Sequence, residues 1–219
     1  MMIDLHTHTI FSDGELLPSE LVRRAKVLGY RAIAITDHAD LTNIESLIEA
    51  GRKARYLEEG YDITVLAGVE LTHVPPKMIA KLAARARELG ADIVVVHGES
   101  PVEPVAPLTN LAAVECPDVD ILAHPGFITE EEAKLAAANG IKLEITARLG
   151  HNITNGHVAQ VARAAGAKLV VDTDTHAPED LITRDRALQI ARGAGLSSQE
   201  AEEALKNSKD LLSSILKNR

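Results

Sequence analysis

Aromatic and basic residues are scarce in this sequence of 219 residues. It has no tryptophan, two phenylalanines and three tyrosines, and its 32 acidic side chains outnumber 23 basic ones, for a net charge of −9. Proteins that bind nucleic acid use basic surfaces and aromatic stacking, so both scarcities count against nucleic acid as a partner. The single cysteine, Cys116, excludes a disulfide framework and a cysteine zinc site, and it is typical of a cytoplasmic protein.

Long apolar runs are also missing. No run approaches the roughly 18–20 residues that span a bilayer, and residues 1–6 have neither the basic region nor the apolar core of a signal peptide. We therefore expect a cytoplasmic protein with no membrane association. Hydrophobic residues at 46 % and charged residues at 25 % are typical of a globular protein, and the length favours a single domain over residues 1–219.

Short apolar segments alternate with amphipathic ones along the chain, which is the pattern of an α/β fold with a parallel sheet. No G-x-G-x-x-G motif follows a predicted strand, which weakens a dinucleotide-binding interpretation. The pattern favours a distorted, TIM-like (β/α)7 barrel of seven strands, with one or two helices at residues 197–219 packing on it. The predicted strands are 2–5, 32–36, 63–69, 92–96, 120–123, 142–145 and 167–172, and the predicted helices are 18–29, 75–90, 129–140, 154–166 and 183–195.

Histidines and acidic residues follow the predicted strands, and the predicted helices carry almost no histidine. The carboxyl ends of parallel strands converge on one face of a barrel, and barrel closure sets the last strand beside the first. Neutral imidazoles and carboxylates are the ligands of borderline divalent metals, so the sequence predicts a site for several metal ions at this face. The residues at the strand ends are His6 and His8, Asp37 and His38, Glu70, His97, His124, and Asp174 and His176.

These residues also carry a resemblance to a known family. In order along the chain, the set resembles the motifs of the PHP (polymerase and histidinol phosphatase) domain, whose fold is a distorted seven-stranded barrel. The resemblance extends from Asp4 to His176, most of the chain. The matching segments are His6-Thr7-His8-Thr9, Ser12-Asp13-Gly14, Thr36-Asp37-His38, Gly68-Val69-Glu70, His97, Ala123-His124-Pro125 and Asp174-Thr175-His176.

The resemblance implies a centre of three divalent ions, either zinc, manganese or iron. Position 13 is histidine in some members of the family and aspartate here. The implied ligands are His6, His8 and Asp174 for a first ion, Glu70 as a bridge to a second ion bound by His97 and His124, and Asp13, His38 and His176 for a third.

The activity implied by the resemblance is hydrolysis of a phosphate monoester by a metal-bridging hydroxide, with a small phosphorylated metabolite as the partner. Histidinol phosphate is the leading substrate, which would place the protein in histidine biosynthesis. Glu70, Asp174 and His176 are the expected catalytic residues. Two alternatives stay open: a phosphodiesterase acting on nucleotides or oligonucleotides, and a metal-bound regulatory module without catalysis.

Three further residues are candidates for substrate binding. Arg148 follows the sixth predicted strand, where a guanidinium group suits a bidentate phosphate contact or a surface ion pair. His151 lies at a polar turn, and His73 lies three residues past Glu70.

Overall fold

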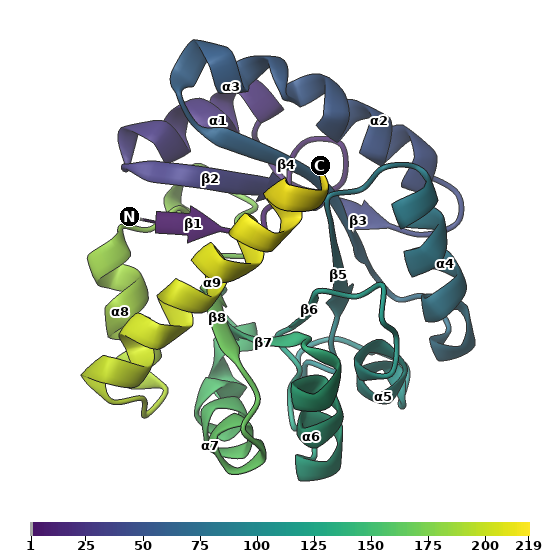
Figure 1. The fold of residues 1–219 in the computed structure, drawn as a ribbon, viewed down its shortest axis with the longest axis vertical. Coiled ribbons are helices and arrows are strands. Elements are labelled where there is room, and N and C mark those ends of the chain that lie inside the picture. Colours follow the sequence, from purple (N-terminus) through teal and green to yellow (C-terminus); the bar gives the residue numbers. More distant parts are fainter. Residues whose placement is uncertain (1) are drawn as a thin grey trace.

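The computed structural model describes residues 2–219, in which a ring of parallel strands is surrounded by helices (Figure 1). Every neighbouring pair of strands is parallel, and the strands follow one another around the ring in the order β1-β2-β4-β5-β6-β7-β8. The short strand β3 (His38–Ala39) lies off this path and pairs with β4. The ring strands are β1 (Met2–Asp4), β2 (Tyr30–Ile35), β4 (Thr64–Leu71), β5 (Ile93–His97), β6 (Ile121–Ala123), β7 (Lys142–Thr146) and β8 (Leu169–Asp172).

Residues just beyond β1 and β8 join the two ends of the ring. Thr7 and Thr175 form an isolated parallel bridge. The His8 amide donates to the Thr175 carbonyl at 2.8 Å, and the Asp174 amide donates to the His6 carbonyl at 3.0 Å. The seven-stranded, nearly closed TIM-like barrel predicted from the sequence is therefore confirmed, and its seam lies at the candidate site.

The four helices predicted between strands and the one predicted after the last strand are confirmed, and three helices were missed. Helix α6 was predicted because Thr129 and Glu132 form a reciprocal capping box at its start. Helix α2 has a weaker local pattern, because it contains Gly51 and leads almost directly into α3. The confirmed helices are α1 (Pro18–Val27), α4 (Pro76–Glu88), α6 (Glu130–Asn139), α7 (Asn155–Ala165) and α8 (Arg184–Gly193), and the missed ones are α2 (Ile44–Ala54), α3 (Tyr56–Tyr61) and α5 (Thr109–Val114).

Two apolar cores hold the barrel together. The larger core lies between the strands and the surrounding helices. The smaller core contains Ile3, Leu5 and Leu66 from the strand side, together with Leu212 and Ile215 of the C-terminal helix α9 (Ser198–Asn218). Helix α9 crosses the ring, as Figure 1 shows, and packs against β1 and β8.

Within residues 2–219, no helix combines the length and the apolar character needed to cross a membrane.

Candidate metal centre

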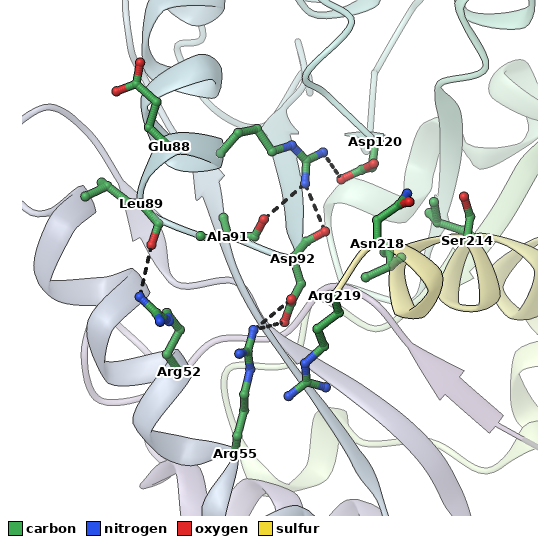
Figure 2. A pocket seen from close by; sticks show the side chains of 14 residues that line it. Arg52, Arg55, Glu88, Leu89, Ala91, Asp92, Asp120, Ser214, Asn218 and Arg219 are labelled. Atoms are coloured by element: carbon green, nitrogen blue, oxygen red, sulfur yellow. Dashed lines mark hydrogen bonds and ion pairs between the residues drawn. The ribbon is translucent and has the colours of Figure 1, made fainter.

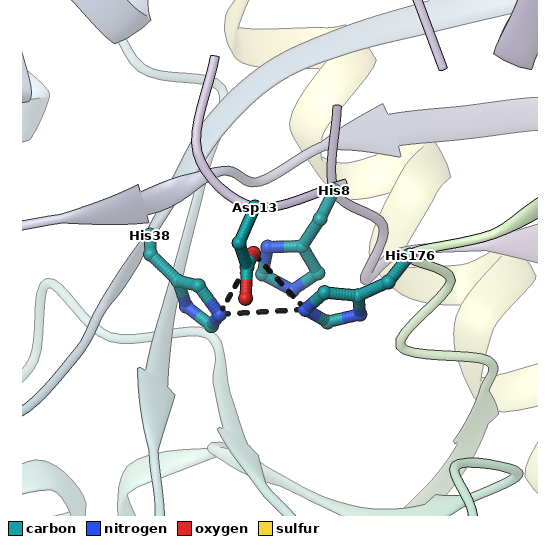
Figure 3. Close-up of side chains that lie close together, drawn as sticks. All are labelled: His8, Asp13, His38 and His176. Carbon is teal, nitrogen blue, oxygen red and sulfur yellow. Dashed lines mark hydrogen bonds and ion pairs between the residues drawn. The ribbon is translucent and has the colours of Figure 1, made fainter. Parts of the chain in front are cut away.

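All nine predicted metal ligands lie in overlapping groups at the carboxyl ends of the strands. One group surrounds a common point, with His8 and Asp13 from the segment after β1, His38 from β3 and His176 from the segment after β8 (Figure 3). Asp13 is the exposed member, because 58 % of its side chain is accessible, so it lies at the mouth of the site. The other groups are His6 with His124 and Asp174, His6 with His8 and Glu70, His97 with His124 and His151, and His73 with His97 and Glu103.

The separations between donor atoms match those expected around a metal ion. Zinc binds nitrogen and oxygen at about 2.0–2.2 Å, so two ligand atoms on one tetrahedral ion lie about 3.3 Å apart. His6 Nε2 lies 3.3 Å from Glu70 Oε1, and His8 Nε2 lies 3.1 Å from Asp174 Oδ1. His176 Nε2 lies 3.2 Å from Asp13 Oδ1.

Hydrogen bonds orient three of the imidazoles so that Nε2 faces the cluster. His6 Nδ1 donates to Glu144 Oε1 at 2.8 Å, and His97 Nδ1 donates to the Gly98 carbonyl at 3.0 Å. His176 Nδ1 donates to the Asp174 carbonyl at 2.8 Å. In the neutral ring this arrangement leaves the lone pair on Nε2, which is the form that binds a metal.

Unpartnered buried atoms provide a test of whether divalent ions fit. Glu70 Oε1 and Asp174 Oδ1 have no hydrogen-bond partner among the described residues, and neither have His8 Nδ1 and His124 Nδ1. Buried carboxylate oxygens without partners are costly in a folded protein. A bound cation would satisfy both carboxylates, so the donor set fits divalent metal ions.

Mutual charges perturb the titration of these buried groups. Burial would lower the pKa of His6, but the charges of Glu144, Glu70 and Asp174 raise it well above its ordinary value. Burial would raise the pKa of Glu70, but the charges of His6 and other histidines hold it well below its usual range. Burial raises the pKa of Asp174 to about 7. Glu70 is therefore ionised at neutral pH and available to a cation.

The backbone is strained at three of the site residues. Positive φ angles occur at His73 (53°), His124 (25°) and Asp174 (53°), a region that side-chain-bearing residues seldom adopt. Such strain is commonly found at functional sites, where the surrounding structure enforces it. Next to His124, Gly126 also has a positive φ, and a Cβ at that position would overlap the Glu99 carbonyl oxygen.

Glu144 is a central residue of the site that the sequence did not point out. It is fully buried in β7, where Oε1 accepts from His6 and Oε2 accepts from the His124 amide at 2.8 Å. The sequence does contain a signal that could have identified Glu144, since this glutamate lies between the aliphatic residues Leu143 and Ile145 of a predicted strand. A charged side chain at a buried strand position needs polar partners, which suggests a role in a site.

Asp37 and Asp172 orient backbone and hydroxyl groups. Asp37 accepts from the Thr9 amide and hydroxyl and from the Ser12 hydroxyl, each at 2.7 Å. It therefore holds the loop that carries Asp13. Asp172 accepts from the Leu5 amide at 2.7 Å and thus joins β8 to β1.

The three predicted substrate residues lie around the mouth, each with a protein partner. Arg148 pairs with Asp180 at 2.8 Å, so its guanidinium is engaged in an ion pair. His73 and His151 both contact Glu103 on the loop between β5 and α5. Glu103 was not identified from the sequence, and nothing in its local pattern marks it.

A cavity of about 680 Å³ lies elsewhere, beside the C-terminal end of α9, and contains several arginines (Figure 2). There Arg55 binds both carboxylate oxygens of Asp92 at 2.7 Å, while Asp92 also accepts from the Ala67 amide. Arg87 donates to a single carboxylate oxygen of Asp120, Oδ2, at 2.6 Å. These pairs anchor strands at the end of the barrel where the strands begin, so we assign them to stability.

Comparison with known proteins agrees with this geometry. The family model described as PHP domain matches residues 4–162. The chain belongs to the PHP domain family. Asp174 and His176 follow the matched span and join the cluster at the barrel seam.

Three relatives of this PHP protein differ in the names they carry. It is 58 % identical over 207 residues to an uncharacterized protein of Methanocaldococcus jannaschii, covering 94 % of this chain and 95 % of the relative. It is 30 % identical to ribonuclease P protein component 3 of Methanosarcina mazei, covering 92 % and 84 % of the two chains. It is 28 % identical to a probable phosphatase of Shewanella frigidimarina, covering 98 % and 92 %.

Solved structures show the same fold. A chain in the structure of archaeal ribonuclease P with mature tRNA matches with a TM-score of 0.75 at 14 % identity, covering 96 % of this chain and 90 % of that one. A candidate histidinol phosphatase of Listeria monocytogenes matches with a TM-score of 0.58 at 11 % identity, covering 82 % and 97 %. Family and phosphatase relatives together support a metal-dependent phosphoesterase.

Proposed function

We propose that this PHP protein hydrolyses phosphate monoesters of small metabolites with the help of three divalent metal ions. The observation that carries the proposal is the cluster of nine donor side chains whose buried carboxylates Glu70 and Asp174 each have an oxygen without a partner. The lone cysteine, Cys116, is buried and unpaired, which favours action in the cytoplasm.

The charge of the loaded site suits an anionic substrate. Three divalent ions bring six positive charges and the carboxylates of Asp13, Glu70 and Asp174 return three, so the site keeps about three positive charges. This local field attracts a phosphate group to a protein whose net charge is −9. Zinc, manganese and iron all suit the imidazole and carboxylate donors.

Each residue has a defined part in the proposed reaction. Ions bound here would lower the pKa of water and neutralise charge on the phosphoryl oxygens. Glu70 stays ionised between the histidines, and Asp174 and His176 join the two sides of the barrel seam around the substrate. Arg148 can contact phosphate once it leaves Asp180, and His73 and His151 are the proposed substrate-binding imidazoles beside Glu103.

A comparison of two chromogenic esters tests the proposal. With Mn²⁺ or Zn²⁺ added, we expect faster turnover of p-nitrophenyl phosphate than of bis-p-nitrophenyl phosphate. Preference for the diester would overturn the monoesterase proposal, and turnover of neither would favour a non-catalytic metal-bound module. A panel of phosphorylated metabolites that includes histidinol phosphate and mononucleotides then identifies the substrate and tests a role in histidine biosynthesis.

Hydrolysis of a nucleic-acid phosphodiester is the second candidate function. Relatives named ribonuclease P protein component 3 weaken the sequence-based argument against a nucleic-acid partner. Cleavage of a short single-stranded RNA, lost in a His97→Ala variant, would favour this function over the monoesterase.

A further inference from the structure

Glu103 lies at the mouth of the metal centre and faces three imidazoles from three different parts of the barrel rim. Its Oε2 atom lies 2.9 Å from His73 Nε2 and 3.3 Å from His97 Nε2. Its Oε1 atom lies 3.3 Å from His151 Nε2. His73 follows β4, His97 ends β5 and His151 follows β7, so this one carboxylate contacts residues from three strand ends of the barrel.

The contact with His73 differs from the contact with His97. The distance of 2.9 Å to His73 is that of an ordinary hydrogen bond. His97 Nδ1 donates to the Gly98 carbonyl, which only accepts, so the neutral His97 ring has its lone pair on Nε2. A lone pair that faces a carboxylate oxygen at 3.3 Å is repelled unless a proton or a cation lies between them.

The same separation is the one expected of two ligands on one metal ion. Ligand atoms at about 2.0–2.2 Å from a tetrahedral zinc lie about 3.3 Å from each other. Family resemblance makes His97 a metal ligand, and the position of Glu103 therefore places a carboxylate oxygen within the same coordination shell. His151 Nε2 lies 3.3 Å from Oε1, the other carboxylate oxygen of Glu103. The Nδ1 atom of His151 is hydrogen-bonded to Ser100 Oγ at 2.7 Å.

We propose that Glu103 is an additional ligand of the ion held by His97, and that His73 positions Glu103 through its hydrogen bond. The proposal rests on the proposed metal-dependent function. Glu103 closes this ion on the side that faces solvent, because 36 % of its side chain is accessible and it belongs to the mouth loop. A phosphate group that binds the same ion has to share or displace this carboxylate.

An ion pair alone does not account for the arrangement. Exposed ion pairs typically contribute less than about 1 kcal/mol, too little to gather three imidazoles around a partly exposed carboxylate. The ring of His97 packs edge-to-face against His124 at 4.4 Å between centroids, so the imidazole that faces Glu103 is itself held within the group of candidate metal ligands.

Metal affinity and cobalt spectroscopy test the proposal without relying on activity. We would measure metal content after dialysis, and titrate Co²⁺ against a competing chelator while recording visible absorption, for wild type, E103Q and the matched control E115Q. Glu115 is exposed at the end of α5, away from the cluster. E103Q keeps the shape of the side chain and removes its charge.

We expect E103Q to weaken one class of bound ion by about 10–100-fold and to change the cobalt absorption, with E115Q unchanged. H73Q is expected to weaken the same class of ion by a smaller factor. E103D, which keeps a carboxylate on a shorter stem, is expected to lie between wild type and E103Q.

Wild-type affinity and an unaltered cobalt spectrum in a folded E103Q protein would overturn the role of Glu103 and leave the proposed function standing. Failure of wild type itself to bind divalent ions would overturn both.

Discussion

Glu144 offers the sharpest test of how the protein prepares its metal ligands. Its two oxygens accept from His6 Nδ1 and from the His124 amide, both at 2.8 Å, inside the barrel wall. In a Glu144→Gln variant the side chain keeps its shape but has one accepting oxygen and one donating amide group. One of the two contacts therefore becomes a clash between donors, or His6 changes tautomer and presents a proton at Nε2.

Either outcome weakens metal binding. Loss of a hydrogen-bond partner behind a metal-binding histidine typically lowers metal affinity about 10–100-fold, which corresponds to about 1.4–2.8 kcal/mol. We expect this loss in a competition assay with a chelator, and an equal or larger fall in kcat/KM for p-nitrophenyl phosphate. The matched control is Glu131→Gln on the exposed face of α6.

The result that would refute this reasoning is a folded Glu144→Gln protein with metal affinity and kcat/KM within twofold of wild type. It would mean that packing alone orients His6, and that the charge of Glu144 has no part in ligand preparation. Thermal unfolding of both variants shows whether a loss of affinity comes from misfolding.

Three further predictions concern the site and the barrel. A His97→Ala variant is expected to lose at least about 100-fold in kcat/KM while unfolding cooperatively, and a loss below tenfold would contradict its role as a ligand. Burial would lower the pKa of His38, but the charge of Glu70 raises it to about 10. Metal affinity measured by chelator competition should therefore rise from pH 6 to pH 10 as this proton leaves, and a flat profile would contradict the assignment. In the absence of metal, the same shift stabilises the fold below pH 6.5, and this stabilisation is lost as the pH rises through about 10. Leu212→Ala in the barrel interior should lower the free energy of unfolding by about 2–5 kcal/mol in a denaturant titration, and a change below about 1 kcal/mol would show that α9 does not close the barrel.

Local signals were enough to predict the elements that have them. Thr129 and Glu132 mark the start of α6, and Gly140 ends this helix by adopting a left-handed backbone conformation. Helix α2 was missed although Asn43 precedes it, and Gly51 inside the helix weakens its local pattern. Its apolar face is stabilised by packing against β4, a contact that a local pattern does not reveal.

The predicted donor side chains lie together where strand geometry alone places them. His6 and His8 are two residues apart on extended chain and reach the same cluster, as alternation requires. Closure of the barrel then brings Asp174 to them, because Thr175 bridges to Thr7. Of the three histidines that the sequence left outside the ligand set, His151 lies beside His97 and His124, and both His73 and His151 contact Glu103.

The sequence by itself determined the kinds of donor and their position at strand ends, because the carboxyl ends of parallel strands in a barrel meet on one face. Only the tertiary structure decided which groups prepare and surround those donors. Glu144 is 138 residues from His6 along the chain and touches it because β7 curves round toward the seam. Glu103 meets His73 and His151 because three loops converge over the barrel mouth, and contacts between distant segments leave no periodic signal in the sequence.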